Sequence, residues 1–134
     1  MKIFIVCSKA FYNRIPYYQD KLISLGHEII LPNCYENPET ESLYRNTDKH
    51  ATWKAQMIKQ SEQKIKNIDA ILTLNFDKNG VDNYIGGATF LEIYDAFRLG
   101  KKIFFVNDIP DGILKDELIG FSPIIIKDNF ELIK

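Results

Sequence analysis

The chain has 134 residues, of which 46% are hydrophobic and 26% charged, and its formal net charge at pH 7 is −1. This length predicts one domain, residues 1–134, with enough apolar residues for a core. The balanced charge provides no basic surface for nucleic acid or anionic lipid, and no apolar run approaches the ~20 residues of a membrane span. We therefore expect neither nucleic acid nor a membrane as a partner.

The N-terminus, MKIFIVCSKAF, carries one lysine and then a short apolar run. That run is too short for a secretory signal peptide, and no small-residue cleavage site follows it. The two cysteines, Cys7 and Cys34, form no disulfide or metal-binding motif, and neither histidine has metal-ligand spacing. We expect a cytoplasmic protein with reduced thiols and with neither a metal nor a cofactor.

The first quarter of the chain predicts a strand followed by a helix. Residues 2–7 form a continuous apolar run that is typical of a buried strand. Apolar residues then recur at helical spacing, at Ile15, Tyr18, Leu22 and Leu25. Pro16 is tolerated only in a first helical turn, so this helix begins near residues 13–15, and Gly26 ends it.

Residues 28–31 predict a second short strand, which Pro32 closes. Residues 33–48 are polar and predict a loop. Residues 49–67 are rich in Lys and Gln and predict a helix, whose thin apolar stripe includes Ile58 and Ile65.

The second half of the chain predicts three more strands, at residues 69–74, 102–106 and 123–126. A long polar loop, residues 75–86, follows the first of them. An amphipathic helix then runs to Gly100.

Strands that are apolar on both faces and separated by helices predict a parallel sheet covered on both sides. Right-handed crossovers then give one doubly wound α/β domain, Rossmann-like or flavodoxin-like, with about five strands flanked by helices. Ligands bind such domains beyond the carboxyl ends of the strands. The segments expected to form the site are residues 7–12, 32–48, 75–92 and 107–112.

Several common catalytic motifs are missing. The sequence has no G-x-G-x-x-G after the first strand, no G-x-x-x-x-G-K-[ST] and no G-x-S-x-G. These absences argue against a dinucleotide-dependent enzyme, a P-loop phosphotransferase and a hydrolase with a nucleophile elbow. Cys7 ends a strand, but no histidine is placed to activate it, so a buried thiol is the favoured interpretation.

The stretch NYIGGATFLEIYDAF, residues 83–97, leads two glycines into a helix that carries Glu92 in its expected first turn. One interpretation is structural. Thr89 and Glu92 match the capping box S/T-x-x-E, in which each side chain bonds to the other residue's amide. The spacing alone favours this interpretation.

A second interpretation is functional. The pair Gly86 and Gly87 is costly unless the backbone must approach something closely or adopt a positive φ. The stretch follows the third predicted strand and therefore lies at the ligand-binding edge. Asn83 and Tyr84, just before the glycines, are suited to hydrogen bonding and stacking.

Two blocks of the chain resemble the nucleoside 2-deoxyribosyltransferase-like family, which includes nucleoside deoxyribosyltransferases and nucleoside 5′-monophosphate N-glycosidases. MKIFIVCS resembles the opening of that family, with Cys7 in place of a glycine and Ser8 matching a serine. GGATFLEIYDAFRLGKKIFFV resembles its second block, with Glu92 on the catalytic nucleophile and Ala96 on an alanine. The resemblance follows the order of the elements over most of the chain and is specific at residues 2–8 and 86–106.

The resemblance implies glycosyl transfer from a nucleoside or nucleoside 5′-monophosphate, without a cofactor, in a homodimer or larger homo-oligomer. A carboxylate close to the anomeric carbon stabilises an oxocarbenium-like sugar or forms a covalent ester with it. The leaving base takes a proton from an acid. Glu92 is the candidate nucleophile, and the residues leave three candidate acids: Glu62, Asp82 and Asp95.

The remaining candidates bind the substrate. Ser8 and Lys9 are suited to hold a hydroxyl or a phosphate, and Phe11, Tyr12 and Trp53 to stack on a base. The full substrate-binding set is Cys7, Ser8, Lys9, Phe11, Asn83, Tyr84, Gly86, Gly87 and Thr89.

This sequence departs from the family pattern at two positions that matter for chemistry. Where the monophosphate hydrolases carry an arginine soon after the serine, only Lys9 is close. Where the family has an aspartate, about two helical turns before the third strand, Ser61 stands beside Glu62. The sequence therefore leaves three functions open: an N-glycosidase or deoxyribosyltransferase, a non-catalytic nucleotide-binding module, and an assembly surface in which Glu92 only caps its helix.

Overall fold

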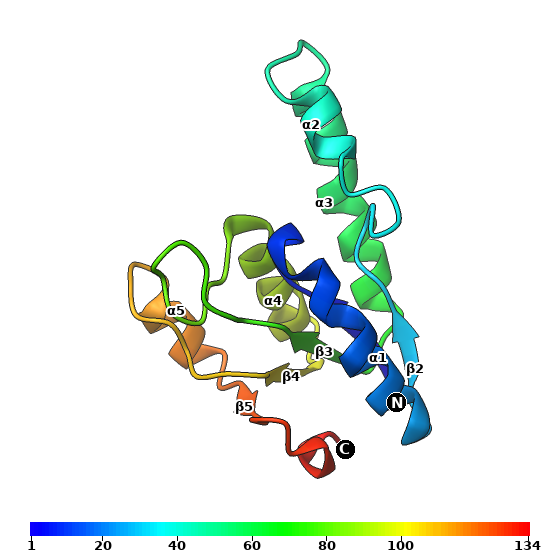
Figure 1. Ribbon diagram of the computed structural model, residues 1–134, viewed down its shortest axis with the longest axis vertical. Helices are drawn as coiled ribbons and strands as arrows, with labels where there is room; N and C mark the ends of the chain where they lie inside the picture. Colours follow the sequence, from blue (N-terminus) through cyan, green and yellow to red (C-terminus); the bar gives the residue numbers. More distant parts are fainter.

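Five parallel strands form a single sheet at the centre of the structure, which is a computed structural model describing residues 1–134 (Figure 1). The strand order is β2-β1-β3-β4-β5. The strands are β1 (Lys2–Val6), β2 (Glu28–Ile30), β3 (Ala70–Thr73), β4 (Lys102–Phe105) and β5 (Ile124–Ile125). This order reverses direction between β1 and β3, which makes that junction the expected ligand-binding point of a doubly wound domain.

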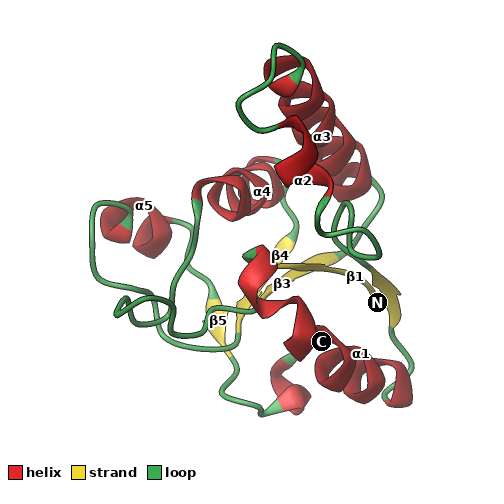
Figure 2. Cartoon of the chain, turned by 45° about the horizontal axis from the view of Figure 1, so that its top comes forward, coloured by secondary structure: helices red, strands yellow, loops and turns green.

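Helices cover both faces of the sheet, as the sequence predicted (Figure 2). The α-helices are α1 (Ile15–Ser24), α2 (Thr40–Tyr44), α3 (His50–Lys66), α4 (Gly87–Arg98) and α5 (Lys115–Gly120), and two 3-10 helices are η1 (Lys9–Arg14) and η2 (Phe130–Leu132). α1 lies on one face, whereas α3, α4 and α5 lie on the other. None of the helices combines the length and the apolar character needed to cross a membrane.

The continuous apolar runs of the strands are explained by burial on both faces. Along β1, Ile3 and Ile5 pack toward α1, and Phe4 and Val6 pack toward α3 and α4. Successive side chains of a strand point to opposite faces, so both sets must be apolar when helices cover both sides. Two core layers result, and they fix the register of the central strands.

The first helix follows its sequence signals closely. α1 begins at Ile15 with Pro16 in its first turn. The preceding residues, Lys9–Arg14, form η1 rather than an irregular loop, and Ser8 caps it through a bond from the Ala10 amide at 3.4 Å. Gly26 has a φ of 90°, the left-handed conformation that ends a helix readily at glycine.

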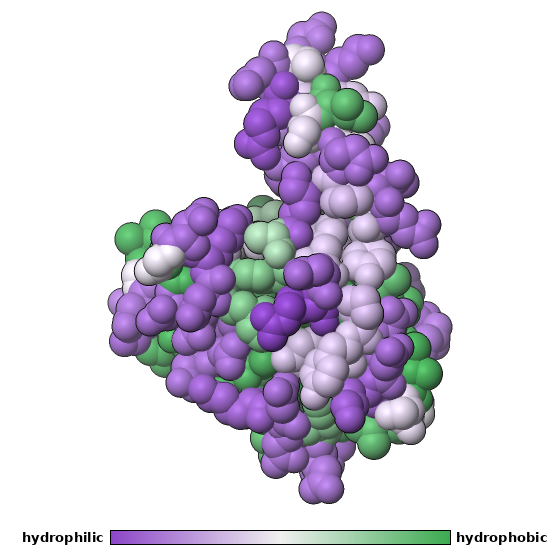
Figure 3. Space-filling model, in the orientation of Figure 1, coloured by the Kyte–Doolittle hydropathy of each residue, from purple (hydrophilic) through white to green (hydrophobic).

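The prediction of a loop over residues 33–48 is only partly right, because residues 40–44 form α2. Tyr44 of α2 stacks on Trp53 of α3, with ring centroids 5.7 Å apart. Together α2 and the amino-terminal half of α3 project from the body of the domain (Figure 1), and Figure 3 shows that their surface is mostly hydrophilic. Packing against the next helix along the chain thus stabilises a helix too short to form alone.

Two loops at the carboxyl edge of the sheet are fastened together by Asn75. Its side-chain amide donates to the carbonyl oxygens of Asn107 and Asp108, both at 3.0 Å. Its side-chain oxygen accepts from the Asn107 amide at 2.9 Å. The loops after β3 and β4 are therefore held in a fixed relation at the edge where ligands bind.

Candidate functional site

A cavity of about 410 Å³ opens at the carboxyl edge of the sheet, at the junction of β1 and β3. Three parts of the chain form its walls: the end of β1 with η1, the β3–α4 loop with the start of α4, and the segment 32–45 with α3. Cavities of a few hundred Å³ are typical of small-molecule sites. The position agrees with the edge that the sequence predicted.

Glu92 lines this cavity from the second turn of α4. The sequence placed Glu92 in the first turn with Thr89 as the cap, and that is wrong. The helix begins at Gly87, Gly86 is its N-cap, and the Phe90 amide donates to the Gly86 carbonyl at 2.9 Å. Thr89 is buried inside the first turn, so the capping box does not form.

The Glu92 carboxylate instead reaches across to α3. Its Oε2 accepts a hydrogen bond of 2.9 Å from the hydroxyl of Ser61, which is buried in the α3–α4 interface. Burial raises the pKa of Glu92 from its ordinary 4.5 to about 7, while the Ser61 bond and the charge of Lys64 lower it. The site therefore holds a carboxyl group that changes charge near neutral pH.

Two lysines lie at the Ser8 end of the cavity. Lys78 Nζ donates to Ser8 Oγ at 3.1 Å and lies 4.7 Å from the centre of the Tyr84 ring. Lys9 also lines the cavity and is exposed. Neither lysine forms an ion pair with a carboxylate of the chain, whereas eight ion pairs form elsewhere. This end of the cavity therefore favours an anionic group.

Gly86 leaves room for Tyr84. A Cβ atom on Gly86 would lie 3.1 Å from the Tyr84 hydroxyl, closer than ordinary contacts allow. A Cβ atom on Gly87 would meet no other atom within 4 Å, so that position is not crowded. The first glycine thus permits the close approach of an aromatic ring at the cavity wall.

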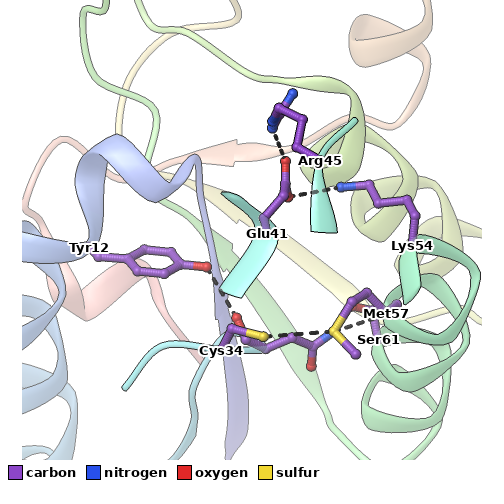
Figure 4. A network of polar contacts seen from close by, with 8 residues as sticks. Tyr12, Cys34, Glu41, Arg45, Lys54, Met57 and Ser61 are labelled. Carbon is purple, nitrogen blue, oxygen red and sulfur yellow. Dashed lines mark hydrogen bonds and ion pairs between the residues drawn. The ribbon is translucent and has the colours of Figure 1, made fainter. Parts of the chain in front are cut away.

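The opposite wall is held by Glu41 of α2. Its carboxylate pairs with Lys54 of α3 at 3.3 Å and with Arg45, so that it lies between the two cations (Figure 4). The Tyr12 hydroxyl points to the same wall and donates to the Asn33 carbonyl at 3.3 Å. These contacts attach the segment after β2 to α3 and to η1.

Cys7 is a neutral part of the cavity wall. Burial, and then the charge of Glu92, raise the pKa of its thiol to about 12. A thiol that does not ionise near neutral pH is a poor nucleophile. No group of three or more His, Cys, Asp or Glu side chains is arranged to hold a metal ion.

Most of the predicted site residues meet at the cavity. Those that line it are Cys7, Ser8, Lys9, Tyr84, Gly86, Gly87, Thr89 and Glu92, joined by Tyr12, Trp53 and Asp95. Both the first strand end and the glycine stretch therefore contribute to one site.

Four predicted residues lie elsewhere. Phe11 is buried in the core, with its ring 5.5 Å from that of Phe76. Asn83 adopts a φ of 55° in the β3–α4 loop and does not line the cavity. Glu62 is on the outer side of α3, where it pairs with Lys66 and Arg98, each at 3.6 Å. The other candidate acid Asp82 is exposed and also lies outside the cavity.

Several residues that line the cavity were not singled out from the sequence, among them Asn33, Glu41, Lys54, Met57 and Lys78. Asn33, Glu41 and Lys78 belong to the strand-end segments expected to form the site, so the topology of the sheet was the available signal. Lys54 and Met57 lie on α3, whose orientation over the sheet edge follows from packing and not from a motif.

No family model matches the sequence, and the comparison with curated proteins likewise finds no match. The resemblance to nucleoside 2-deoxyribosyltransferase-like proteins therefore stays a prediction from the residues quoted above.

Proposed function

We propose that the chain is an N-glycosidase or deoxyribosyltransferase that acts on a nucleoside or nucleoside 5′-monophosphate, with Glu92 as its nucleophile. One observation carries the proposal: a carboxyl group with a pKa near neutrality lies in the cavity at the β1–β3 junction. Above pH 7 the group is mostly ionised, which is the form that attacks a sugar or stabilises its positive charge.

Asp95 is the proton donor that the geometry supports. It lies three residues after Glu92 on α4 and lines the same cavity, unlike the other two candidates. Its carboxylate lies 3.4 Å from the Arg98 guanidinium, which also connects to Glu62 on α3. Arg98 thus helps to orient Asp95, which also lines the cavity.

The proposed reaction has two steps. An oxygen of Glu92 bonds to the anomeric carbon, the carbon–nitrogen bond breaks, and its electron pair passes to the base, which takes a proton from Asp95. Water then gives a proton to Asp95 and cleaves the glycosyl ester, which releases the sugar and restores Glu92. In deoxyribosyl transfer, the nitrogen of a second base takes the place of water.

The cavity wall suits the two ends of such a substrate. Tyr12 offers an aromatic ring on which a base can stack. Ser8 and Lys78, together with Lys9, offer donors to a sugar hydroxyl or a 5′-phosphate. The enzyme is proposed to act in the cytoplasm.

Release of free base tests the proposal. The protein is incubated with a panel of nucleosides and nucleoside 5′-monophosphates, with and without an acceptor base, and the products are separated by chromatography. Intact mass after acid quench detects a glycosyl ester on the protein. We expect free base from at least one substrate and none from Glu92→Gln, with Glu117→Gln, an exposed glutamate on α5, as the matched control.

A non-catalytic nucleotide-binding module is the second candidate, and Ser61 favours it. The family that the sequence resembles has an aspartate at this place, and here a hydroxyl occupies it. A binding module raises the melting temperature when a nucleotide is added, because a ligand that binds only the folded state stabilises it. Stabilisation by a nucleotide without any base release would select this candidate.

We further propose that the chain assembles as a homodimer or larger homo-oligomer. Tyr94 and Phe97 on the outer side of α4 are 45% and 49% exposed. Phe97 packs against Phe121, with ring centroids 5.1 Å apart, which extends the apolar surface toward α5. Contiguous exposed apolar residues of this kind are typical of protein interfaces.

A further inference from the structure

We propose that Asn33 and Ser61 form a positioning relay for the Glu92 carboxylate, in which Asn33 acts on Glu92 through the Ser61 hydroxyl. Both are positioning residues, because neither is placed to react with a substrate. The catalytic value of the relay rests on the proposed function, but the relay itself is a property of the resting protein and is measurable without a substrate.

The relay is a chain of short hydrogen bonds across the α3–α4 interface. Asn33, just after β2, donates through Nδ2 to Ser61 Oγ at 2.9 Å and to the Met57 carbonyl oxygen at 3.0 Å. Ser61 donates in turn to Glu92 Oε2 at 2.9 Å. Both hydrogens of one amide are used, so the Asn33 side chain is fixed in orientation, since a flip would set two acceptor oxygens against each other.

The direction of the Ser61 hydroxyl follows from its place in a helix. A serine inside a helix commonly donates to the carbonyl one turn earlier, which for Ser61 is that of Met57. That carbonyl already accepts the helical bond expected from the Ser61 amide and a second bond from Asn33. Its two lone pairs are therefore occupied, and Glu92 remains as the acceptor for the hydroxyl hydrogen.

The side chain of Asn33 is only partly satisfied in its hydrogen bonding. Its Oδ1 is buried and has no hydrogen-bond partner. A buried acceptor without a partner lowers stability, so a side chain kept only for packing would be better apolar. The two bonds from Nδ2 are what this residue contributes, and both act on the turn of α3 that faces Glu92.

The relay has two consequences for Glu92. The Ser61 bond favours the ionised carboxylate, against the effect of burial. It also occupies Oε2, and Oε1 has no hydrogen-bond partner in the protein, so Oε1 is the oxygen left for a substrate. Other titratable groups around this site are Lys54, Lys64, Asp95, Cys7, Tyr12 and Glu41. None of these six is changed by substituting Asn33 or Ser61.

A double-mutant cycle read by NMR tests the relay. The carboxyl carbon of Glu92 is titrated in protein labelled with ¹³C-glutamate, with Glu92→Gln to assign the signal. Ser61→Ala and Asn33→Leu should each raise the pKa of Glu92 by about one pH unit. Ser61→Ala removes the bond to the charged form, and Asn33→Leu frees the Met57 carbonyl to take the Ser61 hydroxyl hydrogen away from Glu92. Leucine fills the volume of asparagine without donors. In the Ser61→Ala background, Asn33→Leu should add no further shift.

Asn67→Ala is the matched control. Asn67 also donates through Nδ2 to an α3 carbonyl, that of Gln63, at 3.0 Å, but it is exposed at the end of the helix. It should leave the Glu92 titration unchanged. The proposal is overturned if Asn33→Leu shifts Glu92 equally with and without Ser61, or if neither single variant shifts it. Asn33→Ala, compared by the same titration, replaces Asn33→Leu if the larger side chain perturbs the fold.

Base release by the same variants separates the relay from the proposed function. If the chain is a glycosidase, the acid limb of kcat/KM should move to higher pH together with the NMR titration, and the value at high pH should be retained. If no variant and no wild-type sample releases base, the proposed function fails while the NMR cycle still decides the relay.

Discussion

Lys78 and Ser8, which are 70 residues apart in the sequence, meet at one end of the cavity with Nζ 3.1 Å from Oγ. The contact joins the loop after β3 to the end of β1. The strand order of the sheet reverses between these two strands. A lysine held by a neutral hydroxyl keeps its full positive charge available to a ligand.

Replacement of Lys78 by methionine should weaken binding of a nucleoside 5′-monophosphate about tenfold, because one charge-assisted hydrogen bond is lost. Binding of the corresponding nucleoside should change little. Isothermal titration calorimetry measures both. Lys59→Met, an exposed lysine of α3 without an ion pair, is the control. An equal loss for both ligands would contradict an anion-binding role for Lys78.

The Glu92 carboxyl should make stability fall as pH rises. Its pKa is higher in the folded protein, about 7 against the ordinary 4.5, so the charged form is the one that folding disfavours. Its contribution is complete below pH 4.5 and is lost as pH rises through 7, by at most about 3 kcal/mol. Relative to wild type, Glu92→Gln should gain stability between pH 4.5 and pH 7 and should change little between pH 7.5 and pH 8.5. Chemical denaturation at several pH values measures this difference.

The rate of base release should depend on the same group. If Glu92 attacks as a carboxylate, kcat/KM should fall tenfold per pH unit on the acid side of about pH 7. A profile that is flat from pH 5 to pH 8 would show that another group is the nucleophile. Substrate stability without protein is measured in parallel at each pH.

Glu41→Gln should loosen the wall formed by α2 while leaving the sheet intact. The variant loses the pairs with Lys54 and Arg45, which lie near the surface and contribute about 0–1 kcal/mol each. Hydrogen exchange of residues 40–45 should accelerate, and exchange of β1 and β3 should not. Glu36→Gln, an exposed glutamate of the same segment without an ion pair, should leave both unchanged.

Assembly through α4 predicts a mass of at least two chains by light scattering. Tyr94→Glu should yield single chains, because a charge on the outer side of α4 would be buried without a partner. Ile113→Glu, at a position that is 96% exposed in the β4–α5 loop, should not change the mass. A single-chain mass for the wild type at micromolar concentration would exclude the interface.

The sheet was predictable because nearly every residue of its central strands is buried and apolar. Phe4 and Ile5 are neighbours that face opposite core layers, so the run around them is apolar without interruption. A strand buried on both faces has no polar positions, so its sequence shows neither the alternation of a half-exposed strand nor the spacing of an amphipathic helix. The first helix was equally clear because proline and glycine mark its two ends.

The start of α4 was mispredicted because a local motif does not identify its own position in a helix. Thr89 and Glu92 have capping-box spacing, but that spacing also occurs between residues inside a helix. Ile85 and Ile93 pack in the core and hold the helix over the sheet. The helix therefore begins at Gly87, with Gly86 as its N-cap. Glu92 therefore lies in the second turn and faces the cavity, whereas the capping-box pattern had placed it at the helix end.

The partners of Glu92 lay beyond sequence reasoning for a different reason. Ser61 was noted only as a departure from a family pattern, and Asn33 was not noted at all. Asn33 and Ser61 are separated by 28 positions in the sequence, and Ser61 and Glu92 by 31. No local sequence pattern predicts contacts over such separations. Only the placement of α3 against the strand end brings them together.

The segment between β2 and α3 has a property that the other walls of the cavity lack. It leaves the body of the domain with α2 and returns along α3, and it contributes no strand to the sheet. Beyond Asn33, its length and composition can therefore change without altering the hydrogen bonds that hold Glu92. Under the proposed function, variation in residues 34–49 would therefore alter which substrates enter the cavity, while the chemistry at Glu92 stayed the same.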